Sequence, residues 1–160
     1  MLTFGFLTGY AQETAPCEQT CKSASMLIYC SCSYTHHGLP VGEISYSFYA
    51  LIADEGKPIH IDYYEDRGSS NNKVEYPATE KDVCELAHLL KELKVEDFNG
   101  YNEEELMCGG TTYRIYMEYS DGKKLEARWL TQHPKPEAAA AYGEINNFLR
   151  AIAQRQKNNK

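Results

Sequence analysis

Cys84 and His88 are the pair whose types and spacing come closest to a catalytic or metal site in this 160-residue chain. They lie four residues apart in a segment with helical periodicity and fall opposite its apolar stripe, which predicts neighbours on the outer surface. The histidine could lower the pKa of the thiol, or both side chains could form half of a zinc site. No third orienting residue or glycine-rich nucleophile loop accompanies them, so a solvated histidine and a disulfide at Cys84, with Cys108 as one candidate partner, are favoured.

A second set, Cys30-x-Cys32 followed by His36-His37, contains enough ligand types for zinc. Its geometry is unfavourable, because adjacent histidines in a strand point to opposite faces while the two cysteines share one. Small buried side chains are the favoured interpretation of these cysteines.

From these motifs we expect a non-catalytic protein with no metal and no cofactor. Two alternatives stay open. One is a thiol- or metal-dependent enzyme centred on Cys84 and His88, and the other is a structural component of the cell envelope.

The clearest structural element is a β-hairpin of residues 111–119 and 123–130. A two-residue loop would pair Met117 with Glu126 and mix apolar with charged positions. A three-residue loop with Gly122 in the left-handed conformation pairs Met117 with Leu125 instead. This register also predicts the pairs Ile115/Ala127, Tyr113/Trp129, Glu118/Lys124, Tyr116/Glu126 and Arg114/Arg128.

The predicted Arg114/Arg128 pair is a binding signal, because like charges directly opposite one another destabilise a sheet. The compensating anion could come from Glu126, Glu118 or Asp62 within the sheet. It could also come from a ligand or partner protein, since a guanidinium group binds a carboxylate through two parallel hydrogen bonds.

The remaining elements follow from periodicity and capping signals. Residues rich in β-formers or alternating between apolar and polar predict three strands, at 26–35, 43–53 and 57–65. The Gly-, Ser- and Asn-rich residues 66–72 predict a loop after them. Thr79, with Asp82 three residues on, predicts the start of a helix that ends near Lys94, and a second helix should begin at Pro136. The order β-β-β-α-β-β-α predicts an α+β fold with about five mostly antiparallel strands. Two helices packed on one sheet face leave the other face open to water or a partner.

The open sheet face is therefore the predicted binding surface. In the strand of residues 43–53 we assign Tyr46 and Phe48 to the core and Tyr49 to the open face. Tyrosine combines an apolar body with a polar tip, which suits a protein, a peptide or a small anionic ligand. The predicted ligand-binding residues are Arg114, Arg128, Tyr116, Tyr64, His60 and Tyr49.

Composition and charge exclude several classes of protein. Hydrophobic residues make up 42% and charged residues 24% of the chain, as in globular domains rather than disordered, collagen-like or membrane-spanning chains. The formal net charge of −7 repels phosphate, so nucleic acid is not an expected partner.

The N-terminal residues are apolar and uncharged, as in the second half of a signal peptide whose charged start is truncated, with cleavage near Ala11 or Gln12. They are too few to cross a bilayer, so no transmembrane segment is expected. We expect an exported protein, periplasmic or extracellular, in which six cysteines are compatible with disulfides. The expected organisation is a signal-like segment and flexible tail at 1–25, one domain at 26–155 and a polar tail at 156–160.

The second half of the chain resembles an uncharacterised family of small exported bacterial α+β domains. The resemblance rests on residues 90–101, the Gly109-Gly110 pair, the Tyr119-Ser120-Asp121-Gly122-Lys123 turn and the helix that follows Pro134 and Pro136. It covers roughly residues 80–153. It implies an α+β fold. It does not imply any particular activity or catalytic residue.

Overall fold

The computed structural model describes residues 26–37, 44–67, 71–103, 110–130 and 135–157. The expected signal segment and Cys17, Cys21 and Cys108 lie outside these ranges. The described elements are β1 (Leu27–His37), β2 (Ile44–Ile52), β3 (His60–Asp66), β4 (Asn71–Pro77), α2 (Glu80–Glu92), the short 3-10 helix η1 (Val95–Phe98), β5 (Asn102–Glu103), β6 (Gly110–Tyr119), β7 (Lys124–Leu130) and α3 (Pro136–Lys157).

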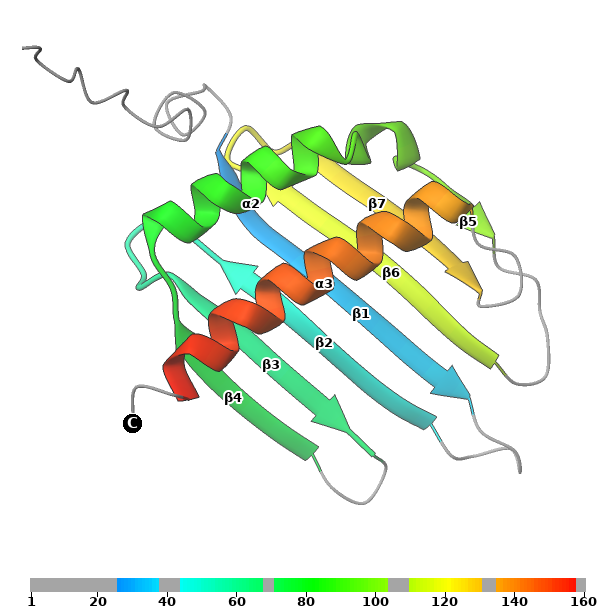
Figure 1. The fold of residues 1–160 in the computed structure, drawn as a ribbon, viewed down its shortest axis with the longest axis horizontal. Helices are drawn as coiled ribbons and strands as arrows, with labels where there is room; N and C mark the ends of the chain where they lie inside the picture. The colour runs from blue at the N-terminus through cyan, green and yellow to red at the C-terminus, as the bar shows by residue number, and fades with distance from the viewer. Residues whose placement is uncertain (1–25, 38–43, 68–70, 104–109, 131–134, 158–160) are drawn as a thin grey trace, which may run out of the picture.

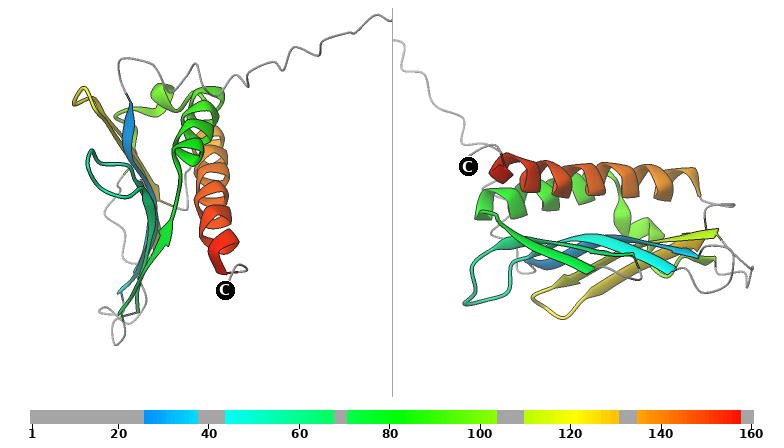
Figure 2. Two further views of the ribbon diagram at one scale, coloured as in Figure 1. Left: turned by 90° about the vertical axis from the view of Figure 1, so that its left-hand side faces the viewer. Right: turned by 90° about the horizontal axis from the view of Figure 1, so that it is seen from below.

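The strands form a seven-stranded sheet with the order β4-β3-β2-β1-β6-β7-β5. Neighbouring strands are antiparallel except β5, which runs parallel to β7. Both α2 and α3 pack on one side of this sheet (Figure 2), and α3 crosses it diagonally (Figure 1). The predicted α+β class and the placement of both helices on one face are confirmed.

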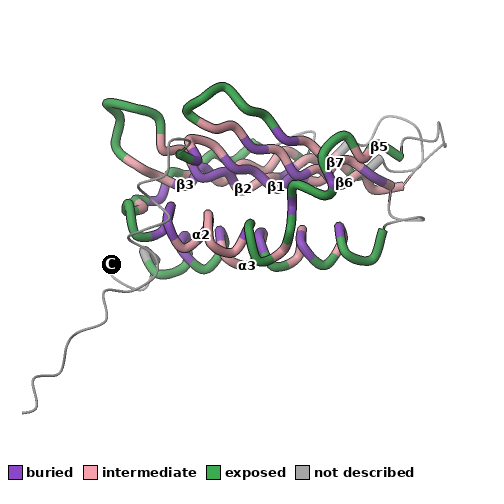
Figure 3. The backbone as a smooth tube through the Cα atoms, turned by 90° about the horizontal axis from the view of Figure 1, so that it is seen from above, coloured by how far each residue is buried: buried purple, intermediate pink, exposed green. Residues whose placement is uncertain are grey.

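The core lies between the sheet and the helices, where buried residues from both layers face one another (Figure 3). Trp129 of β7 is 1% exposed and stacks on Tyr113 of β6, with ring centroids 6.0 Å apart. Tyr142 of α3 contacts Trp129 edge-on at 5.9 Å, so this aromatic cluster fixes the first turns of α3 on the sheet.

Neither α-helix of the described ranges is long and apolar enough to cross a membrane.

The predicted number of five strands is too low. The structure adds β4 between β3 and α2, and the two-residue β5 before the hairpin. β4 contains Asn71, Asn72 and Pro77, which have low strand propensity, because it is an edge strand that needs few of the usual β-formers. At the other end, α3 continues through residues 156 and 157, which were expected to belong to the tail.

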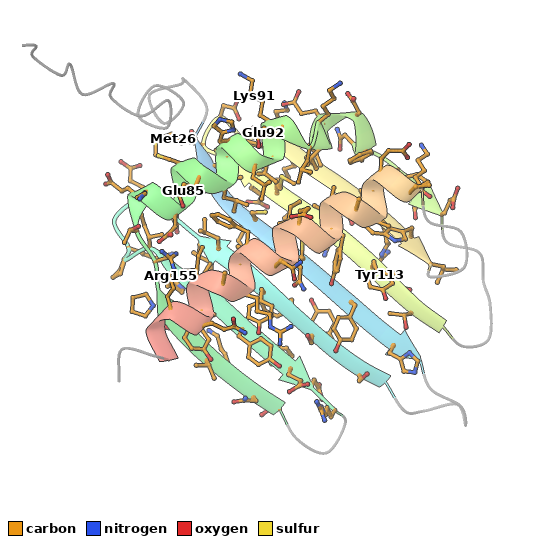
Figure 4. The ribbon with its side chains drawn as sticks, viewed as in Figure 1. Met26, Glu85, Lys91, Glu92, Tyr113 and Arg155 are labelled. Atoms are coloured by element: carbon orange, nitrogen blue, oxygen red, sulfur yellow. The ribbon has the colours of Figure 1, made fainter. Side chains whose placement is uncertain are left out.

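The predicted helix start at Thr79 is confirmed as a capping box. The Thr79 hydroxyl accepts from the backbone N–H of Asp82, and the Asp82 carboxylate accepts from the Thr79 N–H at 2.9 Å. Arg155 of α3 also forms an ion pair with Asp82, and Figure 4 shows Arg155 on the side of α3 that faces the start of α2. The helix then ends at Glu92, close to the predicted end.

The predicted hairpin register is confirmed at every pair from Tyr113/Trp129 to Glu118/Lys124. Gly122 has φ +83°, the left-handed conformation that the three-residue loop requires. The register of the hairpin therefore follows from the alternation of apolar and polar residues along its strands and from Gly122 in the turn.

The two faces of β2 are reversed relative to the prediction. Leu51 pairs with Cys30 of β1 and Ile61 of β3, and all three side chains are fully buried beneath the helices. Tyr49 lies on this side too, whereas Phe48 lies on the open side. Both rows of β2 contain large apolar residues, so alternation could not select one, and pairing with the buried rows of the flanking strands decided the orientation.

Candidate functional site

The sheet face opposite the helices, called the open face below, carries five of the six predicted binding residues. The registers place aromatic, basic and acidic side chains on it from β4 across to β7. The open face is defined here by Tyr29, Tyr46, Phe48, His60, Asp62, Tyr64, Asp66, Lys73, Glu75, Arg114, Tyr116, Glu118, Lys124, Glu126 and Arg128.

An aromatic triad of Tyr46, Phe48 and Tyr64 occupies the β2–β3 part of the open face. Phe48 and Tyr64 stack with ring centroids 5.5 Å apart and an interplanar angle of 23°. The centroid of the Tyr46 ring lies 5.7 Å from that of Phe48 and 6.0 Å from that of Tyr64. The Tyr64 hydroxyl also lies 3.5 Å from the Asp66 carboxylate, so the rings form an apolar platform with a polar edge.

Arg114 is paired within the sheet. Its Nε donates to Glu126 Oε1 at 2.8 Å, and its guanidinium lies 4.7 Å from the centre of the Tyr116 ring. Arg128 stands directly opposite Arg114 in the register and is half-buried. The expectation that an anion must lie near this like-charge pair is thus met by Glu126 from the same sheet.

Tyr116 connects the arginine region to the acidic residue Glu118. Its hydroxyl donates to the Glu118 carboxylate, and its ring contacts Tyr29 edge-on at 5.9 Å. This hydrogen bond raises the pKa of Tyr116. The same hydrogen bond and the Lys124 ammonium, whose Nζ lies 3.0 Å from Glu118 Oε1, lower the pKa of Glu118. The tyrosine therefore stays a neutral donor beside a charged carboxylate.

His60 lies at the other end of the open face, in a group with Asp62 and Glu75 whose ligand atoms are within 4.8 Å of one another. Its Nδ1 lies 2.8 Å from the Pro58 carbonyl, which can only accept, so Nδ1 carries the proton. These are residue types that bind zinc. Lys73 Nζ, however, lies 3.3 Å from Asp62 Oδ2 and 3.1 Å from Glu75 Oε1. The ammonium contacts both carboxylates, and the group is an ion-pair network.

Tyr49 does not belong to the open face, and its prediction as a residue of that face is wrong. Its ring contacts the Tyr63 ring at a tilt of 33°, with centroids 4.7 Å apart, on the side that the helices cover. It also lines a cleft of about 220 Å³ there. The physical reason is the reversed orientation of β2. The described residues thus form two candidate sites, one on each side of the sheet.

The sequence reasoning missed Tyr46 and Phe48 as members of the open face, because it assigned them to the core. A signal was available in the pairing with β3. A register that buries both Leu51 and Ile61 places Phe48 beside Tyr64.

The prediction that Cys84 lies on the outer surface is wrong. The residue is buried, because the apolar stripe of α2 is wide enough to include it, and it is disulfide-bonded to a partner outside the described residues. His88 Nδ1 lies 3.6 Å from Glu92 Oε1 on the same helix. A disulfide-bonded cysteine has no thiol to ionise, so the thiol-enzyme alternative would require reduction of this bond.

Cys30 and Cys32 are free cysteines that are buried in the core, as the favoured interpretation predicted. Burial raises the pKa of Cys30 to about 12 and raises that of Cys32 as well. Both thiols are therefore protonated at neutral pH.

Comparison with protein-family models and with curated proteins finds no match for this chain. The resemblance to small exported bacterial domains therefore stays a prediction, and function has to be argued from the two surfaces.

Proposed function

We propose that this chain is an exported, non-catalytic binding module that docks a partner protein on its open face. The observation that carries the proposal is the aromatic triad of Tyr46, Phe48 and Tyr64, on a sheet face that neither described helix covers. Aromatic side chains gathered on an uncovered face are characteristic of interaction surfaces.

The open face has the anatomy of a protein interface. Tyrosine, phenylalanine and arginine, the side chains enriched at interface centres, alternate here with charged groups that suit a polar rim. A small anion is less favoured as the occupant, because the Arg114 guanidinium is already held by Glu126 and Tyr116.

Charge on the open face is unevenly distributed, which defines the chemistry of the partner. The β3–β4 part carries the acidic Asp62, Asp66 and Glu75 against one lysine. The β6–β7 part carries three basic side chains, Arg114, Lys124 and Arg128, against two glutamates. A complementary partner presents basic groups to β3–β4 and acidic groups to β6–β7.

Two features support export. The disulfide at Cys84 suits an oxidising compartment. The apolar N-terminal residues are typical of a signal peptide.

The test is crosslinking of the intact chain in its native host, followed by binding measurements with the purified partner. Phe48→Ser should weaken that binding at least tenfold, because it removes the centre of the triad. Arg114→Ala should weaken it as well. Glu85→Gln and Lys91→Gln, on the outer side of α2 (Figure 4), are the controls and should leave it unchanged.

Circular dichroism and thermal unfolding of each variant separate loss of binding from loss of fold. A purified partner that binds Phe48→Ser as tightly as the original chain contradicts the proposal. So does a dimer of the original chain that Phe48→Ser dissociates, because the occupant would then be a second copy.

A further inference from the structure

The cleft that contains Tyr49 lies on the helix side of the sheet, away from the open face. It has a volume of about 220 Å³ and lies between α3 and the strands β1 to β3. Because α3 crosses the sheet diagonally, the ends of these strands extend beyond it on one side (Figure 1). An apolar cavity of roughly 150 Å³ can hold benzene, so this cleft has room for one six-membered ring and a small substituent.

The strand side of the cleft is aromatic. Tyr49 and Tyr63 are directly paired across β2 and β3 with ring centroids 4.7 Å apart, and Tyr34 of β1 continues the wall. Ser47 pairs with Tyr34 and is small, which leaves space between the larger rings. A flat ring can therefore contact aromatic surface along this wall.

The helix side of the cleft is polar. Tyr142, Asn146 and Arg150 line it at intervals of four residues, so they form one row along α3. Within the described part of the chain, neither the Asn146 amide nor the Arg150 guanidinium has a hydrogen bond or ion pair. Arg150 is exposed to solvent and brings an uncompensated positive charge to the cleft.

The acidic and phenolic groups around the cleft do not neutralise that charge. The nearby carboxylate of Glu65 is bound to Arg67 at 2.7 Å, and it also accepts from Tyr63. Burial raises the pKa of Tyr63 to about 12 and raises that of Tyr142 too, so both hydroxyls stay neutral donors.

We propose that this cleft binds a small carboxylate that carries a single aromatic ring. The ring packs against Tyr49 and Tyr63, and the carboxylate accepts hydrogen bonds from Arg150 and Asn146. An arginine fork and a planar carboxylate match in geometry, which gives the site its preference for an anion. This site is independent of the open face, so either proposal can fail without the other.

The test is titration of the intact chain with benzoate, followed by NMR. A ligand of this size should bind with a Kd of about 1 mM or slightly below. Benzamide, which has the ring but no charge, and acetate, which has the charge but no ring, should each bind about tenfold more weakly. Amide shifts should change at Tyr49, Tyr63 and Asn146.

Arg150→Gln should lower the affinity for benzoate about tenfold, to that of benzamide, because it removes the charge and keeps a polar side chain. Lys91→Gln makes the same charge change on α2 and should have no effect. Ser47→Leu should also reduce binding, because its larger side chain fills the cleft while the charge is kept.

Three results would overturn the proposal. The first is no saturable binding of benzoate up to about 20 mM, well above the expected Kd. The second is equal binding of benzoate and benzamide, or of benzoate and acetate. The third is an Arg150→Gln variant that binds benzoate as well as the original chain does.

Discussion

At the scale of single residues, the three cysteines within the described ranges divide into two chemical groups. Cys30 and Cys32 are free thiols that are 0% and 1% exposed in the folded state, whereas Cys84 is disulfide-bonded. The reactivity of each group depends on the thiolate, which burial suppresses in the first and covalent bonding abolishes in the second.

The first prediction concerns these cysteines and the export of the chain. In protein purified from its native host, Cys30 and Cys32 should resist iodoacetamide at pH 8 and react only after unfolding, because burial raises the pKa of both thiols. Cys84 should react only after reduction. Mass spectrometry of intact and digested protein measures both, and the mass should lack roughly the first 12 residues.

Unfolding in urea without reductant is the control, because it exposes Cys30 and Cys32 but leaves the disulfide in place. An intact N-terminus together with six reactive thiols would refute the export proposal. It would also make Cys84 and His88 the next residues to test for activity.

At the scale of elements, the start of α2 and the end of α3 are joined at Asp82. Asp82 is 3% exposed, and its carboxylate accepts hydrogen bonds from Thr79 and Arg155. Burial raises its pKa, but the hydrogen bonds from Arg155 and Thr79 outweigh that effect and hold the pKa below its usual value. The ion pair therefore stabilises the charged form and links the two helices.

The second prediction follows from the sign of that shift. A carboxylate with a lowered pKa stabilises the fold above its unfolded pKa, near 4, and this contribution is lost as the pH falls through the folded value. Asp82→Asn should cost about 1–3 kcal/mol of unfolding free energy at pH 7 and less below about pH 4. Urea unfolding at several pH values measures the difference.

Glu80→Gln is the matched control, since Glu80 is an exposed acidic residue in the same first turn of α2. It should change stability by a few tenths of a kcal/mol. A cost for Asp82→Asn that stays constant between pH 7 and pH 3 would show that the charge of Asp82 does not contribute.

At the scale of the whole molecule, the orientation of β2 decides which residues form the core and which form the open face. Leu51 is fully buried between β1, β3 and the helices. Phe48 is half-buried on the opposite side, where its main partners are Tyr46 and Tyr64. Truncation of each residue therefore tests one of the two faces of the sheet.

The third prediction compares truncations on the two faces of β2. Leu51→Ala should cost about 2–5 kcal/mol of unfolding free energy, because it leaves a cavity in the core. Phe48→Ala should cost about 1 kcal/mol, since it removes aromatic contacts at a solvated surface. Equal costs, or the reverse order in urea unfolding, would mean that the faces of β2 are assigned incorrectly.

Much of the fold could be predicted from local patterns. The hairpin register needed only the alternation of apolar residues and the turn glycine Gly122, and all of its pairs were found. The predicted binding residues Arg114, Arg128, Tyr116, Tyr64 and His60 were placed on the correct face, because side chains alternate between the two faces along each strand. β4 could not be predicted, because an exposed edge strand does not require a strong pattern.

Local patterns alone indicate the features that depend on neighbours within about fifteen residues, such as the Thr79–Asp82 capping box and the pairing of Arg114 with Arg128. Only the tertiary structure decided how distant segments meet. It brought Arg155 to Asp82, 73 residues away, and selected the buried row of β2. It also set the α3 row of Tyr142, Asn146 and Arg150 against the tyrosines of the sheet. The physical reason is that capping and turn signals are short-range, whereas burial depends on which elements pack together.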